Sequence, residues 1–259
     1  MNRFAYLICF SLLLVKAAGA QTPAAFSTSK PWAYWWWPGS AVTEKGITHN
    51  LESFAKAGFG GLHIIPIYGA KDFESAFLTF LGPEWKKKFA FVLKESQRLH
   101  LGIDMTLGTG WPLGGPQVQA TNAAKRYQIE SFIVGANQSF HLPLGDIQAA
   151  SVFVEGHFEK ELISAQATSF TAGSQGATIY VLMQKGTGQQ VKRAAPGGEG
   201  LVMDHFSKAA FEKYRAEFVP LLKQGHAPLR ALYNDSYEVY GANYTPKLFE
   251  AFEQLNHYD

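Results

Sequence analysis

Along the chain, short apolar runs alternate with stretches in which apolar residues recur at helical spacing, beginning near Pro31. The aromatic run from Trp32 to Trp37 predicts a strand that ends at Pro38-Gly39. Thr43 is the expected N-cap of a helix whose apolar residues recur three or four positions apart. The continuous apolar run from Leu62 to Ile67 is typical of a strand that is buried on both faces.

The same alternation continues further along the chain. Pro83 is a favourable first helical residue, and the segment from Ile103 to Leu107 predicts a third strand. A fourth strand is expected from Leu229 to Tyr233, and a last helix is expected to open at Thr245-Pro246. Before the fourth strand, Ser207 is the expected cap of one continuous helix whose apolar positions are Phe211, Tyr214, Phe218 and Leu221.

Between the third strand and Ser207 the periodicity changes. From about residue 127 to residue 192, strand-like runs alternate with Gly, Ser and Gln. The predicted strands cover Gln128–Val134, Ala150–Val154 and Thr178–Met183. This pattern predicts an inserted β-rich subdomain that ends near the Ala194–Gly198 junction.

The four strand-helix units favour parallel strands joined by helices. The first strand is not followed by the Gly-x-Gly-x-x-Gly pattern of a dinucleotide-binding fold. We therefore predict an α/β fold: a partial (β/α)8 TIM-type barrel of about four units with the inserted β-rich subdomain. Half a barrel would have open sheet edges, so we expect the sequence to be truncated or to need a second chain. The predicted boundaries are 31–125 for the first part of the barrel, 126–195 for the insertion and 196–259 for the truncated continuation.

The first twenty residues have the pattern of a secretory signal peptide. Arg3 is followed by an apolar run from Phe4 to Val15, and Ala18-Gly19-Ala20 supplies small residues at a cleavage point. The run is short for a membrane span, although a membrane anchor is the competing interpretation. We expect a secreted or periplasmic bacterial protein that is not inserted in a membrane after cleavage. Because Cys9 is the sole cysteine, the mature chain would have no disulfide.

Charge and composition narrow the classes of partner. The chain has 23 Lys and Arg and 21 Asp and Glu, and without Arg3 and Lys16 the two counts are equal. This neutrality argues against nucleic acid as a partner. Aromatic residues make up 14% of the chain and include six tryptophans. Their flat faces suit sugar rings, but a large aromatic core would have the same composition.

In a barrel of parallel strands, the site forms at the carboxyl ends of the strands. Glu238 follows the fourth strand, and a glycosidase needs a carboxylic acid to protonate the leaving oxygen. Apolar or like-charged surroundings keep such an acid protonated, and Tyr237, Val239, Tyr240 and Asp235 are its neighbours in sequence. A surface glutamate on a loop is the alternative. By position, the candidate substrate-binding residues are Trp36, Trp37, His63, Asp104, Trp111 and Asp235.

Several of these candidates also have a structural explanation. Asp104 interrupts an apolar strand, so it either contacts a ligand or is paired with a structural partner. His63 fits a core histidine as well as a catalytic one. Alternation along a strand places Trp36 and Trp37 on opposite faces, of which one packs under helices. The spacings contain no His/Glu zinc site, no nucleophile elbow and no phosphate-binding loop, and the metal ligands are unknown.

Several segments together resemble glycoside hydrolase family 106, the bacterial α-L-rhamnosidases. They are Pro31–Gly39, Ala57–Gly61, Leu81–Trp85, Leu101–Asp104, Gly108–Pro116 and Asp235–Glu238. The resemblance covers nearly everything after residue 30 except the insertion. It implies a (β/α)8 catalytic domain in a longer protein that releases α-L-rhamnose from plant-type polysaccharides or glycosides with inversion. It makes Glu238 the general acid and calcium a candidate cofactor, and it places the general base beyond Asp259.

Other functions fit the same residues. A glycosidase for another sugar would keep the fold, because loops set specificity. A non-catalytic sugar-binding protein would also keep the aromatic residues. A lyase or isomerase would use Asp104 and His63. Because the resemblance implies that the base is absent, we expect residues 1–259 alone to be nearly inactive on an aryl α-L-rhamnoside.

Overall fold

The computed structural model describes residues 29–223 and 229–258. The predicted signal peptide, residues 1–20, lies outside this part of the chain. Among the helices of the described residues, none combines the length and the apolar character that crossing a membrane requires.

Four parallel strands form the sheet that was predicted from the apolar runs. They are β1 (Trp32–Pro38), β2 (Gly61–Ile67), β3 (Gly102–Thr106) and β12 (Ala231–Tyr233), in that spatial order. Each successive strand therefore adds to the same edge of the sheet. Six of the seven β2 residues are buried, as the continuous apolar run predicted.

Two helices cover one face of this sheet. They are α1 (Glu44–Lys56) and α2 (Pro83–Arg98), and α1 starts where Thr43 Oγ1 accepts a hydrogen bond from the Gly46 amide at 3.1 Å. Trp37 packs edge-on against Trp85 of α2, with ring centroids 6.0 Å apart. Trp85 in turn stacks on Phe89, so an aromatic core joins the sheet to its helices.

The helix expected after Ser207 is divided in two. Ser207 caps α3 (Lys208–Ala216) as predicted, but α4 (Val219–Lys223) is a separate short helix. Pro220 explains the interruption, because proline has no amide hydrogen and its ring clashes with the carbonyl four residues earlier. The prediction of one continuous helix was therefore wrong, although Tyr214, Phe218 and Leu221 are buried as expected.

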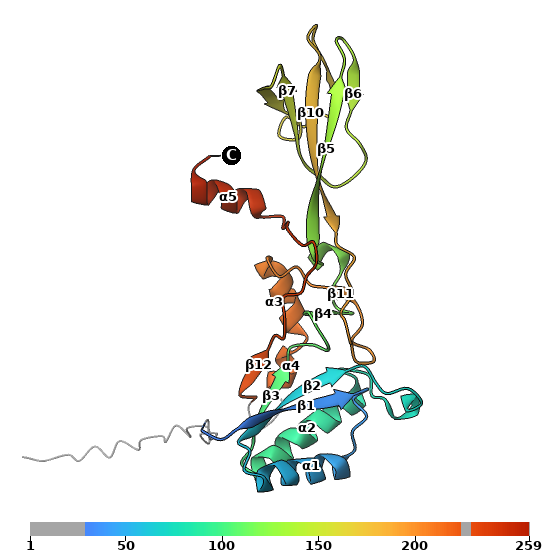
Figure 1. The fold of residues 1–259 in the computed structure, drawn as a ribbon, viewed down its shortest axis with the longest axis vertical. Helices are drawn as coiled ribbons and strands as arrows, with labels where there is room; N and C mark the ends of the chain where they lie inside the picture. Colours follow the sequence, from blue (N-terminus) through green and yellow to red (C-terminus); the bar gives the residue numbers. More distant parts are fainter. Residues whose placement is uncertain (1–28, 224–228, 259) are drawn as a thin grey trace, which may run out of the picture.

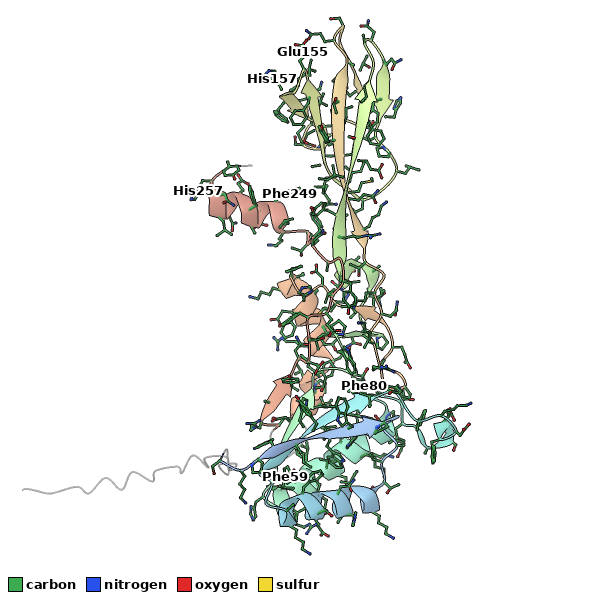
Figure 2. All side chains as sticks on the ribbon, viewed as in Figure 1. Phe59, Phe80, Glu155, His157, Phe249 and His257 are labelled. Carbon is green, nitrogen blue, oxygen red and sulfur yellow. The ribbon has the colours of Figure 1, made fainter. Side chains whose placement is uncertain are left out.

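The β-rich insertion is a long antiparallel sheet with a hydrophobic core of its own. Its strands lie in the order β5 (Lys125–Val134), β10 (Ala177–Gly186), β7 (Ile147–Val154) and β8 (His157–Glu161). A further pair, β6 (Ser139–His141) and β9 (Ser169–Thr171), lies beside this sheet. The insertion extends along the long axis of the molecule (Figure 1). Glu155 and His157 mark its outer part, far from Phe59 and Phe80 in the α/β part (Figure 2).

The last helix, α5 (Leu248–Asn256), begins later than predicted. Thr245 does not cap it, because the Thr245 hydroxyl donates to Asp204 Oδ2 at 3.0 Å. Figure 1 shows α5 standing away from the parallel sheet, on the side of the insertion. A cleft of about 670 Å³ is lined by α5 together with β7, β8 and the residues that follow β8.

Candidate active site

The face of the parallel sheet opposite α1 and α2 carries polar and aromatic side chains. Tyr34, His63 and Asp104 are register neighbours on β1, β2 and β3. Tyr34 and Trp36 are 55% and 44% exposed, whereas Trp35 and Trp37 face the helices and are buried. Strand alternation therefore determines which aromatic residues can meet a ligand.

Trp37 does not lie on this face, which we call the open face because Tyr34 and Trp36 are exposed on it. It is completely buried between Trp35 and Trp85, with edge-on ring contacts to both. The expectation that Trp37 contacts substrate is therefore corrected: its place in β1 puts it in the core. Trp36, the preceding residue, remains a candidate because it points to the other face of the sheet.

His63 lies at the centre of the open face. Its Nε2 is 3.0 Å from Thr106 Oγ1. The rings of Tyr34 and Tyr233 contact it edge-on at centroid distances of 5.3 and 4.8 Å. Burial lowers the pKa of His63, and the carboxylates of Asp104 and Asp235 oppose this shift. The neutral imidazole is therefore favoured near neutral pH.

Asp104 is paired with a structural partner. Arg230, directly before β12, donates from Nε to Asp104 Oδ1 at 3.0 Å and from Nη2 to Oδ2. The Arg230 guanidinium also lies over the ring of Trp32, 3.8 Å from its centroid. The sequence left a ligand contact and a structural pair as interpretations of Asp104, and this geometry corresponds to the structural pair. Through Arg230, the contacts connect the start of β12 to β1 and β3.

One segment, residues 187–193, reaches the loops that follow three of the parallel strands. Lys192 exchanges backbone hydrogen bonds with Trp111, at 2.8 and 3.0 Å, in the loop after β3. The carbonyl of Arg193 accepts from the amide of Tyr68, which follows β2, and its guanidinium lies 4.9 Å from the Tyr68 ring centroid. Side chains of the same segment contact the loop after β12. We call residues 187–193 the return segment, because it leads the chain back from the insertion.

Glu238 lies on the loop after β12, at the carboxyl edge of the sheet. Its side chain is 49% exposed, and Oε2 is 3.3 Å from Lys192 Nζ. The Tyr240 hydroxyl is 3.5 Å from the same oxygen, and Tyr237 is exposed. The apolar surroundings expected from the sequence are therefore not what the fold provides. The carboxyl instead has an ammonium and a phenol as its partners.

The loop that carries Glu238 also presents other polar atoms. Asp235 is exposed and lies close enough to His63 to oppose the shift in its pKa. Asn234 Oδ1, Ser236 Oγ and His205 Nδ1 are buried without a hydrogen-bond partner among the described residues. These three residues line one cavity of about 10 Å³, the scale of a single water molecule.

Several residues of this region were missed by sequence reasoning. Lys192 and Arg193 form a dibasic pair just before the predicted junction, and their charge was the available signal. Tyr34 and Tyr233 could have been found from alternation, since Tyr34 shares a face with Trp36. Gln189 and Arg230 had no local signal, because their partners are distant in sequence.

Calcium is the cofactor that the family resemblance suggests. Ca²⁺ takes six to eight oxygen ligands, usually including several carboxylates. Among residues 29–223 and 229–258, no three His, Cys, Asp or Glu side chains converge on one point. Calcium as a cofactor stays a prediction from the family resemblance, and no chemical step is assigned to the ion.

Comparison with known proteins shows first the fold and then the family. A solved structure of a rhamnosidase from Novosphingobium sp. PP1Y matches with a TM-score of 0.66 at 16% identity, over 92% of this chain and 41% of that one. A protein of Formosa agariphila with the name "Putative beta-glucuronidase" is 23% identical over 93% of this chain and 25% of its own length. The chain thus spans less than half of either protein.

The similarity to the rhamnosidase structure shows the fold, and a family model shows the family. The model for glycoside hydrolase family 106, described as alpha-L-rhamnosidase, matches residues 21–184. That is more than half of the chain, and the chain belongs to this family.

Proposed function

We propose that this chain contributes the acid half of an inverting α-L-rhamnosidase site, with Glu238 as the general acid. The observation that carries the proposal is the position of Glu238 at the carboxyl edge of four parallel strands, on the loop after β12. This edge is where (β/α)8 barrels place their catalytic groups. The proposal includes a barrel of which β1, β2, β3 and β12 are one part.

In this mechanism Glu238 donates a proton to the glycosidic oxygen as the bond to the anomeric carbon breaks. A second carboxylate activates water on the opposite face of the sugar, roughly 6.5–9.5 Å from the acid. We place that second carboxylate outside residues 1–259, as the family resemblance implies. Tyr34, Trp36 and Tyr233 on the open face and Trp111 at its edge would supply aromatic and hydroxyl contacts to a terminal rhamnose of an oligosaccharide or polysaccharide. Secretion to the periplasm or medium is part of the proposal.

The test compares the full-length protein with its Glu238→Gln variant. With an alkyl α-L-rhamnoside, we expect kcat to fall by about 10² to 10⁴, because a poor leaving group needs general-acid assistance. Ligand affinity should persist, since the amide keeps the shape of the side chain. Proton NMR of the first product should show the β-anomer. Residues 1–259 alone should turn over an aryl α-L-rhamnoside far more slowly than the full-length protein.

The other functions predict different results. A sugar-binding protein would lose nothing measurable in Glu238→Gln, because it has no bond cleavage to lose. A glycosidase for another sugar is favoured by the name of the Formosa relative, so an aryl β-D-glucuronide is assayed in parallel. Turnover of the glucuronide without turnover of the rhamnoside would overturn the proposed substrate while leaving the glycosidase class intact.

A further inference from the structure

The return segment makes hydrogen bonds to the backbone of the loop that carries Glu238. The side-chain amide of Gln189 donates from Nε2 to the carbonyl of Glu238 at 2.7 Å. Its Oε1 accepts from the backbone amide of Tyr240, also at 2.7 Å. The Gln189 side chain thus fixes the backbone on both sides of Val239. One of the two residues that it fixes is Glu238, the candidate acid.

Lys192 contacts the side chain of Glu238. Its Nζ is 2.8 Å from the Tyr240 hydroxyl and 3.3 Å from Glu238 Oε2, and it lies 4.3 Å from the centroid of the Tyr240 ring. The hydrogen bond to Tyr240 and then the one to Glu238 raise the pKa of Lys192, so the ammonium keeps its charge. The ammonium can therefore act as a fixed point for the carboxyl.

Both side chains come from an anchored backbone. Lys192 is bonded to Trp111 through its own amide and carbonyl. The backbone carbonyl of Gln189 accepts a hydrogen bond from the backbone amide of Val202. The backbone amide of Gln189 donates to Thr187 Oγ1 at 3.3 Å. The return segment therefore connects the loop after β12 to the loop after β3 through hydrogen bonds to both.

From this geometry we infer that Gln189 and Lys192 are positioning residues for the Glu238 carboxyl. The inference rests on the proposed role of Glu238 and goes beyond it, because it assigns the orientation of the acid to the end of the insertion. The side chains of Lys192 and Glu238 are 39% and 49% exposed, so solvent screens the pair and it contributes little to folding stability. Its effect is expected on the geometry of proton transfer, where small displacements are costly.

The experiment uses leaving groups to separate positioning from folding. In the full-length protein, Lys192→Met should lower kcat for an alkyl α-L-rhamnoside by about tenfold to a hundredfold. For an activated aryl rhamnoside, which departs with little protonation, kcat should fall by less than about threefold. Gln189→Leu should give the same selective loss. Lys192→Arg should recover most of the activity on the alkyl substrate.

Controls make each outcome decisive. Lys45→Met on α1 removes an exposed lysine away from the site and should leave kcat unchanged for both substrates. Melting curves should show that every variant is folded. Equal losses on both substrates in Lys192→Met would mark a structural role and overturn the inference. If Glu238→Gln alone shows the selective loss, the acid assignment stands and the positioning role is wrong. If Glu238→Gln shows none, the acid assignment fails and the inference fails with it.

Discussion

At the scale of single residues, His63 shows how a polar group in an apolar strand is accommodated. Its imidazole has Thr106 as hydrogen-bond partner and two tyrosine rings at its edges. Sequence reasoning could place His63 in a buried strand, but it could not choose between core and ligand roles. The deciding neighbours, Thr106 and Tyr233, come from β3 and β12, and the register of these strands is a product of tertiary structure.

The burial of His63 predicts a pH-dependent stability. Its pKa is lowered from the ordinary value of 6.5, so the unfolded chain binds a proton at a higher pH than the folded chain. The stabilising contribution is complete above that value and is lost as the pH falls below it toward the folded-state pKa. The melting temperature should therefore be lower at pH 5.5 than at pH 7.5. His63→Gln should reduce this difference by about 1–3 °C.

The measurement is thermal melting of the full-length protein, followed by far-UV circular dichroism at both pH values. Burial also lowers the pKa of His205, so His63→Gln should remove only part of the difference, and the double variant with His205→Gln should remove more. His157→Gln, in exposed β8, serves as the matched control. An undiminished difference in His63→Gln would show that burial of this ring does not drive the pH dependence.

At the scale of elements, local sequence signals predicted what depends on neighbouring residues. Thr43, Ser207 and Pro83 lie at the helix starts where they were expected, and the apolar run before Tyr68 is β2. The return segment was not predicted, because it has no periodicity and its structure comes from contacts with three distant loops. For the same reason, the partners of Glu238 could not be read from its sequence neighbours.

Gly110 is the point at which the loop after β3 crosses the return segment. Its φ is +49°, and a Cβ there would lie 2.0 Å from the carbonyl oxygen of Lys192. Gly110→Ala should therefore displace the return segment and destabilise the protein by about 1–3 kcal/mol. Activity on an alkyl rhamnoside should fall with it, since the same segment carries Lys192.

The control for Gly110→Ala is Gly173→Ala, because a Cβ at Gly173 would meet no atom within 4 Å. Urea unfolding followed by far-UV circular dichroism, which reports on both parts of the chain, measures the free energy of unfolding of both variants. Unchanged stability and activity in Gly110→Ala would mean that the return segment can move away from the loop without consequence. A rigid return segment would then not be needed to position Glu238, which would contradict the positioning role of Lys192.

At the scale of the whole molecule, the described residues contain two separate hydrophobic cores. One joins the parallel sheet to α1, α2, α3 and α4, and the other fills the insertion. The change in periodicity near residue 127 indicated the β-strands that form the second core, and the predicted domain bounds stay a prediction. It did not predict that the insertion would end in a segment that contacts the candidate site, since that contact depends on where the return segment leaves the insertion.

The two cores predict that the α/β part folds without the insertion. Lys125 and Gly186 are register partners on β5 and β10, so a two-residue Asn-Gly turn can join them in place of residues 126–185. The return segment is retained. All six tryptophans of residues 1–259 lie outside the excised residues, so none of them reports on the insertion. We expect the full-length protein with this excision to keep a cooperative tryptophan melting transition within about 5 °C of the parent.

Some loss is expected from the excision, because the Tyr244 hydroxyl donates to Gln148 at 2.9 Å and the Tyr127 amide donates to Asn243 at 3.0 Å. Both bonds join the insertion to the chain between β12 and α5, so their removal should loosen that linker and leave the parallel sheet intact. A matched excision of residues 136–172 removes β6, β7, β8 and β9 but keeps the β5–β10 pair, and it should disrupt the core of the insertion while the tryptophan transition persists. If either excision abolishes the cooperative transition, the two cores fold as one unit, and the insertion supports the sheet as well as the loop that carries Glu238.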